Sequence, residues 1–292
     1  MTSDNCTLAG LIGQSIAQSL SPALHEAEGH ALGRDYRYRL FDIDHEPAGA
    51  AALPAILDRM QVEGYAGCNV TFPLKQAVIP LLDRLSPEAD AMGAVNTVRF
   101  DADGSREGHN TDWWGFGENL RRSIPAAAVD TVAILGAGGA GAAAAYALCR
   151  MGARELLVID RDVERANALV SRLSGGSTTL LPISFEDAEA RLADADGLVQ
   201  ATPIGMTKLP GMPISPTALR PDLWLAEIVY VPIETELLRA ARQLGCRTVD
   251  GGGMVVLQAA RAMEIIAGLA VDPDRMQKHL LALLSGKVAE QG

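Results

Sequence analysis

Residues 131–152, TVAILGAGGAGAAAAYALCRMG, restrict the fold more than any other segment. An apolar run typical of a buried strand leads into a turn with Gly136, Gly138 and Gly141, and an alanine-rich helical stretch follows. The first glycine permits a tight turn, the second lets a pyrophosphate approach the backbone, and the third lets the helix lie close to the strand. The helix N-terminus then offers free N–H groups and the positive end of its dipole to phosphates. We therefore expect a dinucleotide-binding loop made of Gly136, Ala137, Gly138, Gly139, Ala140 and Gly141, and not a turn that only packs closely.

The residue type at position 160 bears on which dinucleotide is bound. Asp160 ends the next strand-like run, about twenty residues beyond the loop. A carboxylate there can accept hydrogen bonds from an adenosine ribose and repels a 2′-phosphate, which favours NAD over NADP. Arg161 and Arg165 favour NADP, because a guanidinium can pair with that phosphate. Capping of the next helix by Asp160 or Asp162 is the structural alternative. We expect NAD, with NADP less favoured.

Strand and helix patterns continue after this loop in the order typical of a doubly wound sheet. We expect strands at 155–162, 197–206 and 223–230, and helices at 163–174, 232–245, 254–268 and 272–286. Periodicity alone leaves open whether the last two helices return to the first part of the chain.

The first 110 residues alternate in the same way, which indicates an α/β layer with mostly parallel pairing. We expect strands at 7–13, 36–43 and 64–72, and helices at 21–33, 46–60 and 73–85. A chain of 292 residues, 48% of them apolar, can bury a core in each of two domains. The fold class that we expect is α/β, with an N-terminal α/β domain and a Rossmann-type doubly wound parallel sheet.

Charge and cysteine usage exclude several classes of partner. The net charge is −11 and there is no run of Lys or Arg, which argues against nucleic acid or an anionic membrane but leaves a small anionic substrate open. The four cysteines form no C-x-x-C pair, which argues against a zinc site or a disulfide framework, and we expect no metal. The N-terminus has no basic segment of a signal peptide, and no apolar run approaches the roughly 18 residues of a membrane span. By elimination, we expect a soluble cytoplasmic protein.

Seven short stretches carry a resemblance to a known family. They are GQSIAQSLSP, NVTFPLK, GAVNT, GHNTD, GAGGAG, ATPIGM and DGGGMVVLQAA, in that order, from Gly13 to about Gln258. Together they resemble the shikimate dehydrogenase family, including its quinate/shikimate members. The resemblance implies a substrate domain at residues 1–111 plus 251–292, an NAD(P)-binding domain at 112–250, and a cleft between them. It also implies a small cyclohexane or cyclohexene carboxylate as substrate, and it leaves a homodimer open.

The resemblance implies that Lys75 is the catalytic lysine and that Asp112 is its partner. Oxidation of a secondary alcohol moves a hydride to the nicotinamide and a proton to a base, and the reverse reaction needs an acid at the same place. One side chain beside the reacting oxygen can do both. Without the neighbouring motifs, Lys75 would be interpreted as a surface lysine at the start of a helix.

The remaining implied residues hold the two ligands. On the substrate side they are Ser19, Ser21, Thr71, Asn96, Tyr230 and Gln258. On the cofactor side they are Ala201, Thr202, Ile228, Gly251 and Met254, besides the glycine loop and residues 160, 161 and 165. Ser19 and Ser21 alternate, so on an extended segment both hydroxyls face one side and can hold one carboxylate. Capping by Ser21, just before Pro22, is the structural alternative.

Three departures from the common family pattern leave the substrate and the cofactor open. His109 stands in GHNTD where many biosynthetic members have Asp and quinate-type members often have His, and Trp113 and Trp114 follow Asp112. Asp160 replaces the small polar residue of NADP-using members. The alternatives are an NADP-dependent biosynthetic shikimate dehydrogenase and a dehydrogenase of an aminated analogue. From a different class, a non-catalytic module that senses NAD or such a carboxylate is also open, although it would need no Lys75 and Asp112.

Overall fold

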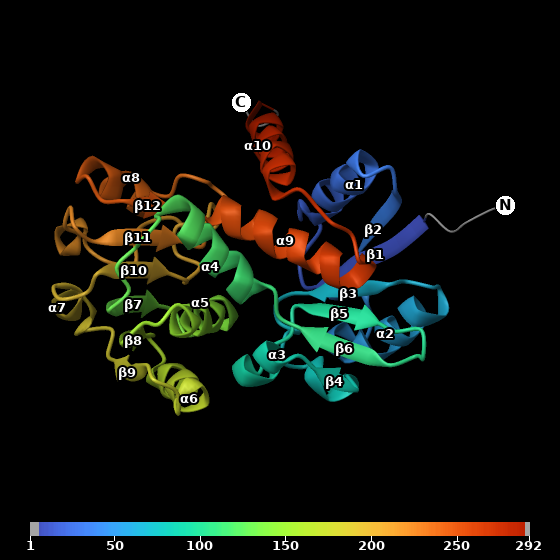
Figure 1. Ribbon diagram of the computed structural model, residues 1–292, viewed down its shortest axis with the longest axis horizontal. Helices are drawn as coiled ribbons and strands as arrows, with labels where there is room; N and C mark the ends of the chain where they lie inside the picture. The colour runs from blue at the N-terminus through green and yellow to red at the C-terminus, as the bar shows by residue number, and fades with distance from the viewer. Residues whose placement is uncertain (1–5, 290–292) are drawn as a thin grey trace. The chain divides into compact units, whose positions relative to one another are not determined.

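The computed structural model describes residues 6–289, which divide into two compact units (Figure 1). The first unit comprises residues 6–111 and 258–289, and the second comprises Asp112–Leu257. Helix α9 (Gly251–Ala267) contributes its first residues to the second unit and the remainder to the first. Residues 1–5 and 290–292 of the expected substrate domain lie outside the described residues.

The second unit is built on an entirely parallel sheet of order β12-β11-β10-β7-β8-β9. Its strands are β7 (Thr131–Leu135), β8 (Glu155–Ile159), β9 (Thr179–Ile183), β10 (Gly197–Gln200), β11 (Trp224–Glu227) and β12 (Thr248–Val249). Counted from β7, this is the 3-2-1-4-5-6 order of a dinucleotide-binding sheet, and the order reverses between β7 and β10. The expected Rossmann-type fold is confirmed.

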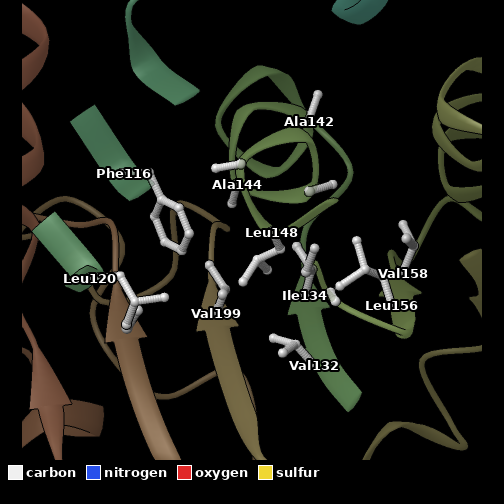
Figure 2. Packing of buried hydrophobic residues seen from close by; sticks show 14 of the residues in the cluster. Phe116, Leu120, Val132, Ile134, Ala142, Ala144, Leu148, Leu156, Val158 and Val199 are labelled. Carbon is white, nitrogen blue, oxygen red and sulfur yellow. The ribbon is translucent and has the colours of Figure 1, made fainter. Parts of the chain in front are cut away.

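Helices cover both faces of this sheet. They are α4 (Asp112–Ser123), α5 (Gly139–Arg150), α6 (Val163–Leu173), α7 (Ala188–Leu192) and α8 (Glu236–Gln243). Val132 and Ile134 of β7 face α4 and α5, as Figure 2 shows, whereas Ala133 and Leu135 belong to the cluster that packs against α7 and α8. Because successive side chains of a strand point to opposite faces, the unbroken apolar run TVAIL is what a strand covered on both faces requires.

The first unit has a mixed sheet of order β2-β1-β3-β5-β6-β4. Its elements are β1 (Cys6–Gly13), β2 (Asp35–Asp42), β3 (Gly67–Val70), β4 (Arg84–Leu85), β5 (Thr97–Phe100), β6 (Arg106–His109), α1 (Ser21–Ala31), α2 (Leu53–Val62), α3 (Pro87–Met92), the end of α9, and α10 (Pro273–Ala289). Strands β1, β2 and β3 are parallel, and β5 runs antiparallel to β3 and β6. Cys68 and Val70 pack with α2, whereas a Cβ on Gly67 would meet Ile266 of α9, so helices again lie on both faces.

The helix expected at 73–85 is wrong. This segment forms turns, a short 3-10 helix (Ile79–Leu81) and β4. Pro73 and Pro80 have no N–H to donate, and bonds of the tighter i to i−3 kind occur instead, such as Leu74 N–H to Thr71 O at 2.9 Å. Lys75 therefore lies in a turn, where its main-chain carbonyl accepts the Val95 N–H at 2.8 Å.

The C-terminal helix α10 packs against α1 through a buried carboxylate. Glu28 is fully buried and accepts hydrogen bonds from Nη2 and Nε of Arg275 at 2.6 and 2.8 Å, and from the Asp272 N–H at 2.9 Å. The last stretch of the chain therefore belongs to the first unit. None of the helices within residues 6–289 has the length and apolar character that a membrane span requires.

Candidate active site

The glycine loop of the second unit has the geometry that a dinucleotide phosphate requires. Gly136 has a φ of +101°, which permits the turn after β7, and a Cβ on Gly141 would overlap the carbonyl oxygen of Gly136. A Cβ on Gly138 would meet nothing within 4 Å, so the backbone is open there. Gly138 is the N-cap of α5 and supplies no side chain to its first N–H groups. These uncapped donors and the open backbone fit a pyrophosphate at the helix N-terminus.

Asp160 is fixed against this loop by two backbone groups. Its Oδ2 accepts the Ala137 N–H at 2.7 Å and its Oδ1 accepts the Asp162 N–H at 2.9 Å. The N-cap of α6 is Asp162, whose Oδ1 accepts the Glu164 N–H at 3.1 Å, so Asp160 is not the capping residue. Each Asp160 oxygen keeps one lone pair that can accept a ribose hydroxyl.

The two arginines beside Asp160 have partners of their own. The guanidinium of Arg161 lies 5.1 Å from the centre of the Phe185 ring. The Nε of Arg165 lies 3.3 Å from Oδ2 of Asp162, and both side chains are exposed. The segment after β8 thus carries the carboxylates at 160 and 162 as well as these two guanidinium groups.

The loop after β10 is organised by a residue that sequence reasoning missed. Gln200 is fully buried, and its Oε1 accepts the N–H and the hydroxyl of Thr202 at 3.0 and 2.9 Å. Its Nε2 donates to the Ile204 carbonyl at 2.7 Å. A Cβ on Gly136 would lie 2.9 Å from the Ala201 carbonyl oxygen, so the residues at 201 and 202 lie beside the glycine turn as a cofactor-bordering loop would. A polar residue ending the apolar run GLVQ was the available signal.

The segment after β11 is held by a second buried polar group, Glu227. Its carboxylate accepts the Val229 N–H at 3.0 Å and the Thr235 hydroxyl at 3.0 Å, and burial raises its pKa to about 7. A Cβ on Gly251 would overlap the Ile228 carbonyl, so this glycine is required where α9 begins. Sequence reasoning did not select Glu227.

Two further expected residues of the second unit, Met254 and Tyr230, are buried and half-buried, respectively. Met254 is buried in the core cluster that contains α4 and α5. Tyr230 is half-buried and burial raises the pKa of its hydroxyl. It is the one expected substrate residue in this unit, since residues 19, 21, 71, 96 and 258 lie in the first.

The two serines of the first unit lie together as expected. Their hydroxyl oxygens are 3.1 Å apart, and the Ser21 N–H donates to Ser19 Oγ at 3.2 Å. The structural alternative, capping by Ser21, does not occur, because α1 begins at Ser21 itself and its N-cap is Leu20, which has no side-chain bond. A residue inside the first turn cannot cap that turn. Instead, Ser19 Oγ accepts the Ser21 N–H, which has no partner within the helix.

The loop that leads to these serines is held by two aspartates that sequence reasoning missed. Ser15 has a φ of +53°, and its N–H and that of Ile16 donate to the two oxygens of Asp42 at 3.0 and 2.9 Å. The Ser15 hydroxyl donates to Asp44 Oδ2 at 2.6 Å, which together with Gln14 holds the pKa of Asp44 below its usual range. A non-glycine residue in the left-handed region is uncommon, and here three hydrogen bonds hold it.

Asn96 lies in a dense group of buried polar side chains. Its Oδ1 accepts the Thr111 N–H at 2.8 Å and its Nδ2 donates to Thr111 Oγ1 at 3.0 Å. The Thr111 hydroxyl lies 3.5 Å from Gln258 Oε1. Thr71 is half-buried, and its methyl group leaves no room for a Cβ on Gly13. The residues at 96 and 258 are thus joined by Thr111, which sequence reasoning did not select.

The two expected catalytic residues occupy different local structures. Lys75 is half-buried in the turn after β3, and Asp112 is the buried first residue of α4, where a carboxylate is favoured by the helix dipole. The division into units falls directly before Asp112. His109 is partly buried, and burial lowers its pKa.

Comparison with known proteins identifies the family. Residues 11–98 match the shikimate dehydrogenase substrate binding domain, and residues 118–206 match the shikimate / quinate 5-dehydrogenase domain. A shikimate dehydrogenase (NADP(+)) of Streptomyces avermitilis is 48% identical over 291 residues, 99% of each chain. The chain belongs to the shikimate dehydrogenase family.

Other members differ in the cofactor that they name. A quinate/shikimate dehydrogenase (NAD(+)) of Corynebacterium glutamicum is 45% identical over 278 residues, 94% of this chain and 98% of the relative. The solved quinate dehydrogenase from Corynebacterium glutamicum in complex with NAD has a TM-score of 0.91 at 44% identity, over 95% of this chain and 100% of that one. As a shikimate dehydrogenase family member, the chain is an NAD(P)-dependent oxidoreductase, and the expected family and enzyme class are confirmed.

The residues expected to hold the substrate and the cofactor lie on well-defined local structures. Among residues 6–289, no group of three or more His, Cys, Asp or Glu side chains is arranged to hold a metal ion. The sequence motifs located the glycine loop and the segments around positions 19, 71 and 96. They did not reveal the polar groups that hold those segments, which are the partly buried Asp42 and the buried side chains at 111, 200 and 227.

Proposed function

We propose that this chain is an NAD-dependent dehydrogenase that reversibly oxidises the C3 hydroxyl of shikimate, quinate or both to the 3-dehydro product. The observation that carries the choice of NAD is the carboxylate of Asp160, held against the glycine loop by the Ala137 N–H at 2.7 Å. This hydrogen bond fixes the position of the carboxylate beside the glycine loop, and a carboxylate close to an adenosine 2′-phosphate repels the phosphate of NADP. The NAD-dependent relative from Corynebacterium glutamicum supports the same choice.

The acid–base chemistry is assigned to Lys75 and Asp112. The Lys75 amine takes the proton from the alcohol during oxidation and returns it during reduction, and the Asp112 carboxylate orients that amine and accepts a hydrogen bond from a ring hydroxyl. When bound, the nicotinamide accepts or returns the hydride. No group of the chain needs to hold a metal for this chemistry.

Substrate orientation is assigned to hydroxyl and amide groups of the first unit. Two serine hydroxyls 3.1 Å apart, at 19 and 21, can both donate to one carboxylate. Thr71, Asn96 and Gln258 supply a hydroxyl and two amides to the ring hydroxyls, and Tyr230 of the second unit adds a phenol. Quinate has an extra hydroxyl at the carboxylate carbon, so acceptance of quinate depends on the space around the two serines.

An NADP-dependent biosynthetic shikimate dehydrogenase is the second candidate. The exposed guanidinium groups of Arg161 and Arg165 support it, and so does the NADP-dependent relative of Streptomyces avermitilis. Homodimer formation, which the sequence left open, is compatible with either candidate.

A two-by-two rate comparison tests the proposal. The purified chain is mixed with NAD or NADP and with shikimate or quinate, and the absorbance of the reduced nicotinamide is followed. The expected result is a higher kcat/KM with NAD than with NADP for at least one of the two alcohols. Faster turnover with NADP selects the second candidate. No turnover in any of the four mixtures contradicts the dehydrogenase assignment and favours an aminated substrate or a binding module.

A further inference from the structure

Five polar side chains form a continuous buried hydrogen-bonded chain in the first unit. They come from β2, β3, β5, the residue directly before β5 and the segment directly before α4, and each is at most 7% exposed. This buried polar chain consists of Tyr38, Asn69, Thr97, Asn96 and Thr111. The buried polar chain joins residue 38 to residue 111, more than 70 residues further on, and so links segments that are far apart in the sequence.

The orientation of Asn69 is determined by a group that can only accept. Its Nδ2 lies 3.2 Å from the main-chain carbonyl oxygen of Asn96, so the amide nitrogen must face that way. Its Oδ1 consequently faces the hydroxyl of Tyr38, which donates to it at 2.8 Å. The buried phenol keeps its proton, because burial raises the pKa of Tyr38 well above 10.

The orientation of Asn69 determines which groups donate and which accept in the rest of the buried polar chain. The second N–H of Asn69 donates to Thr97 Oγ1 at 3.0 Å, and the Thr97 hydroxyl uses its single hydrogen to donate to Asn96 Oδ1 at 3.0 Å. The Thr111 N–H donates to the same oxygen at 2.8 Å. With its oxygen held by two donors, the Asn96 amide is fixed in one orientation, in which its Nδ2 donates to Thr111 Oγ1 at 3.0 Å.

We propose that Tyr38 is a positioning residue for the substrate: its hydroxyl donates to Asn69 Oδ1 and, together with the Asn96 carbonyl, holds Asn69 in the orientation that continues along the buried polar chain to the amide of Asn96. This inference rests on the proposed role of Asn96 in binding a ring hydroxyl. Without the Tyr38 hydroxyl, Asn69 Oδ1 loses its donor in a buried environment, and the Asn96 carbonyl alone then determines the orientation of the amide. An amide held at one end is placed less precisely for donation to Thr97, and the hydrogen bond from Thr97 to the Asn96 oxygen is weakened with it.

The same strand provides a matched control. Tyr36 lies two residues before Tyr38 on β2, is equally buried at 4% exposure, and also lies beside the ring of His25. Its hydroxyl has no hydrogen-bond partner among the residues that the structure describes. Replacing either tyrosine by phenylalanine removes one oxygen atom from the same layer of the core, but only one of the two changes breaks the buried polar chain.

The first experiment compares Tyr38→Phe with Tyr36→Phe by steady-state kinetics on the full chain. Tyr38→Phe is expected to raise KM for the alcohol and to lower kcat/KM about tenfold, with KM for the dinucleotide unchanged. Tyr36→Phe is expected to leave all three at wild-type values. Equal effects of the two variants, or an unchanged KM for the alcohol in Tyr38→Phe, overturn the positioning role. If the wild-type chain turns over neither shikimate nor quinate, both this inference and the proposed function fail.

A second pair of variants tests the middle of the buried polar chain. Thr97→Val removes the hydroxyl at nearly constant volume and is expected to reproduce the kinetics of Tyr38→Phe, whereas Thr97→Ser keeps the hydroxyl and is expected to restore values close to wild type. In an Asn96→Ala background, Tyr38→Phe is expected to have no further effect on KM for the alcohol, because the group that it orients is gone. Additive effects in that double variant, or failure of serine to restore KM, overturn the inference.

Discussion

At the scale of single residues, the turn that carries Lys75 determines where its side chain begins. Its carbonyl accepts the Val95 N–H at 2.8 Å, which joins this turn to the segment that leads to Asn96. The two segments that the proposal assigns to proton transfer and to substrate binding are therefore held by one main-chain bond. A lysine on a free helix surface would lack such an anchor.

Replacement of Lys75 by alanine is expected to lower kcat by roughly 10²–10⁴-fold, since the group that takes and returns the proton is removed. KM for the dinucleotide should change little, because the glycine loop belongs to the other unit. Lys278→Ala on α10 is the control and should keep wild-type turnover. Near-normal kcat in Lys75→Ala, measured from nicotinamide absorbance, would contradict the assigned role.

Asp160→Asn is expected to shift the preference from NAD towards NADP by about tenfold or more in the ratio of the two kcat/KM values. The amide can still accept the Ala137 N–H, but the charge that repels a 2′-phosphate is gone. Asp130→Asn removes a charge just before β7, at the opposite end of that strand from the glycine loop, and serves as control. An unchanged ratio in Asp160→Asn would show that this carboxylate does not select the cofactor.

At the scale of elements, the strand-end loops are held by buried polar side chains rather than by apolar packing. Glu227 is one of these, and it titrates near neutrality. Its folded pKa of about 7 lies above its ordinary value of 4.5, so between these values the folded chain holds a proton that the unfolded chain has released. The contribution of Glu227 to the free energy of unfolding is therefore fully present below about pH 4.5 and is lost as the pH rises to about 7.

Glu227→Gln is expected to abolish the loss of stability that Glu227 causes as the pH rises. The free energy of unfolding of the wild type should fall relative to that of the variant by about 3 kcal/mol as the pH rises from about 4.5 to about 7. Urea denaturation at several pH values measures the difference. Glu236→Gln, at an exposed position in the first turn of α8, should track the wild type at every pH. Parallel pH profiles of wild type and Glu227→Gln would contradict the assignment.

How far the elements could be predicted depended on whether their determinants were local. The run TVAIL and the glycines that follow it specify strand, turn and helix within about 20 residues, and these were predicted correctly. The segment 73–85 was predicted as a helix because its apolar spacing is helical, yet its two prolines and its bonds to other segments produce turns. The pairing of Tyr38 with Asn69, 31 residues apart, leaves no periodic signal in either segment. Motifs thus located the candidate residues, whereas the groups that orient them required the structure.

At the scale of the whole molecule, the first unit depends on a buried ion pair between the two ends of the chain. Glu28 is fully buried on α1, and Arg275 of α10 supplies two of its three hydrogen bonds. Burying a carboxylate is costly unless it is paired, so loss of the partner is much more damaging than loss of an exposed ion pair.

Arg275→Leu is expected to lower the free energy of unfolding by about 3 kcal/mol, because the carboxylate of Glu28 stays buried without its cation. Arg261→Leu is the matched control, since its ion pair with Glu264 is exposed and its loss should cost less than about 1 kcal/mol. Urea denaturation of the full chain measures both. Equal costs would show that the Glu28 pair contributes no more than a surface pair.

The path of the chain through the two units has a consequence for biosynthesis. The second unit is one uninterrupted stretch, whereas the first is completed only by residues that follow Leu257. Because domains fold as units while the ribosome is still adding residues, the later stretch can reach its native state first. The amino-terminal stretch, although made earlier, must wait for α10 to emerge before Glu28 meets its cation.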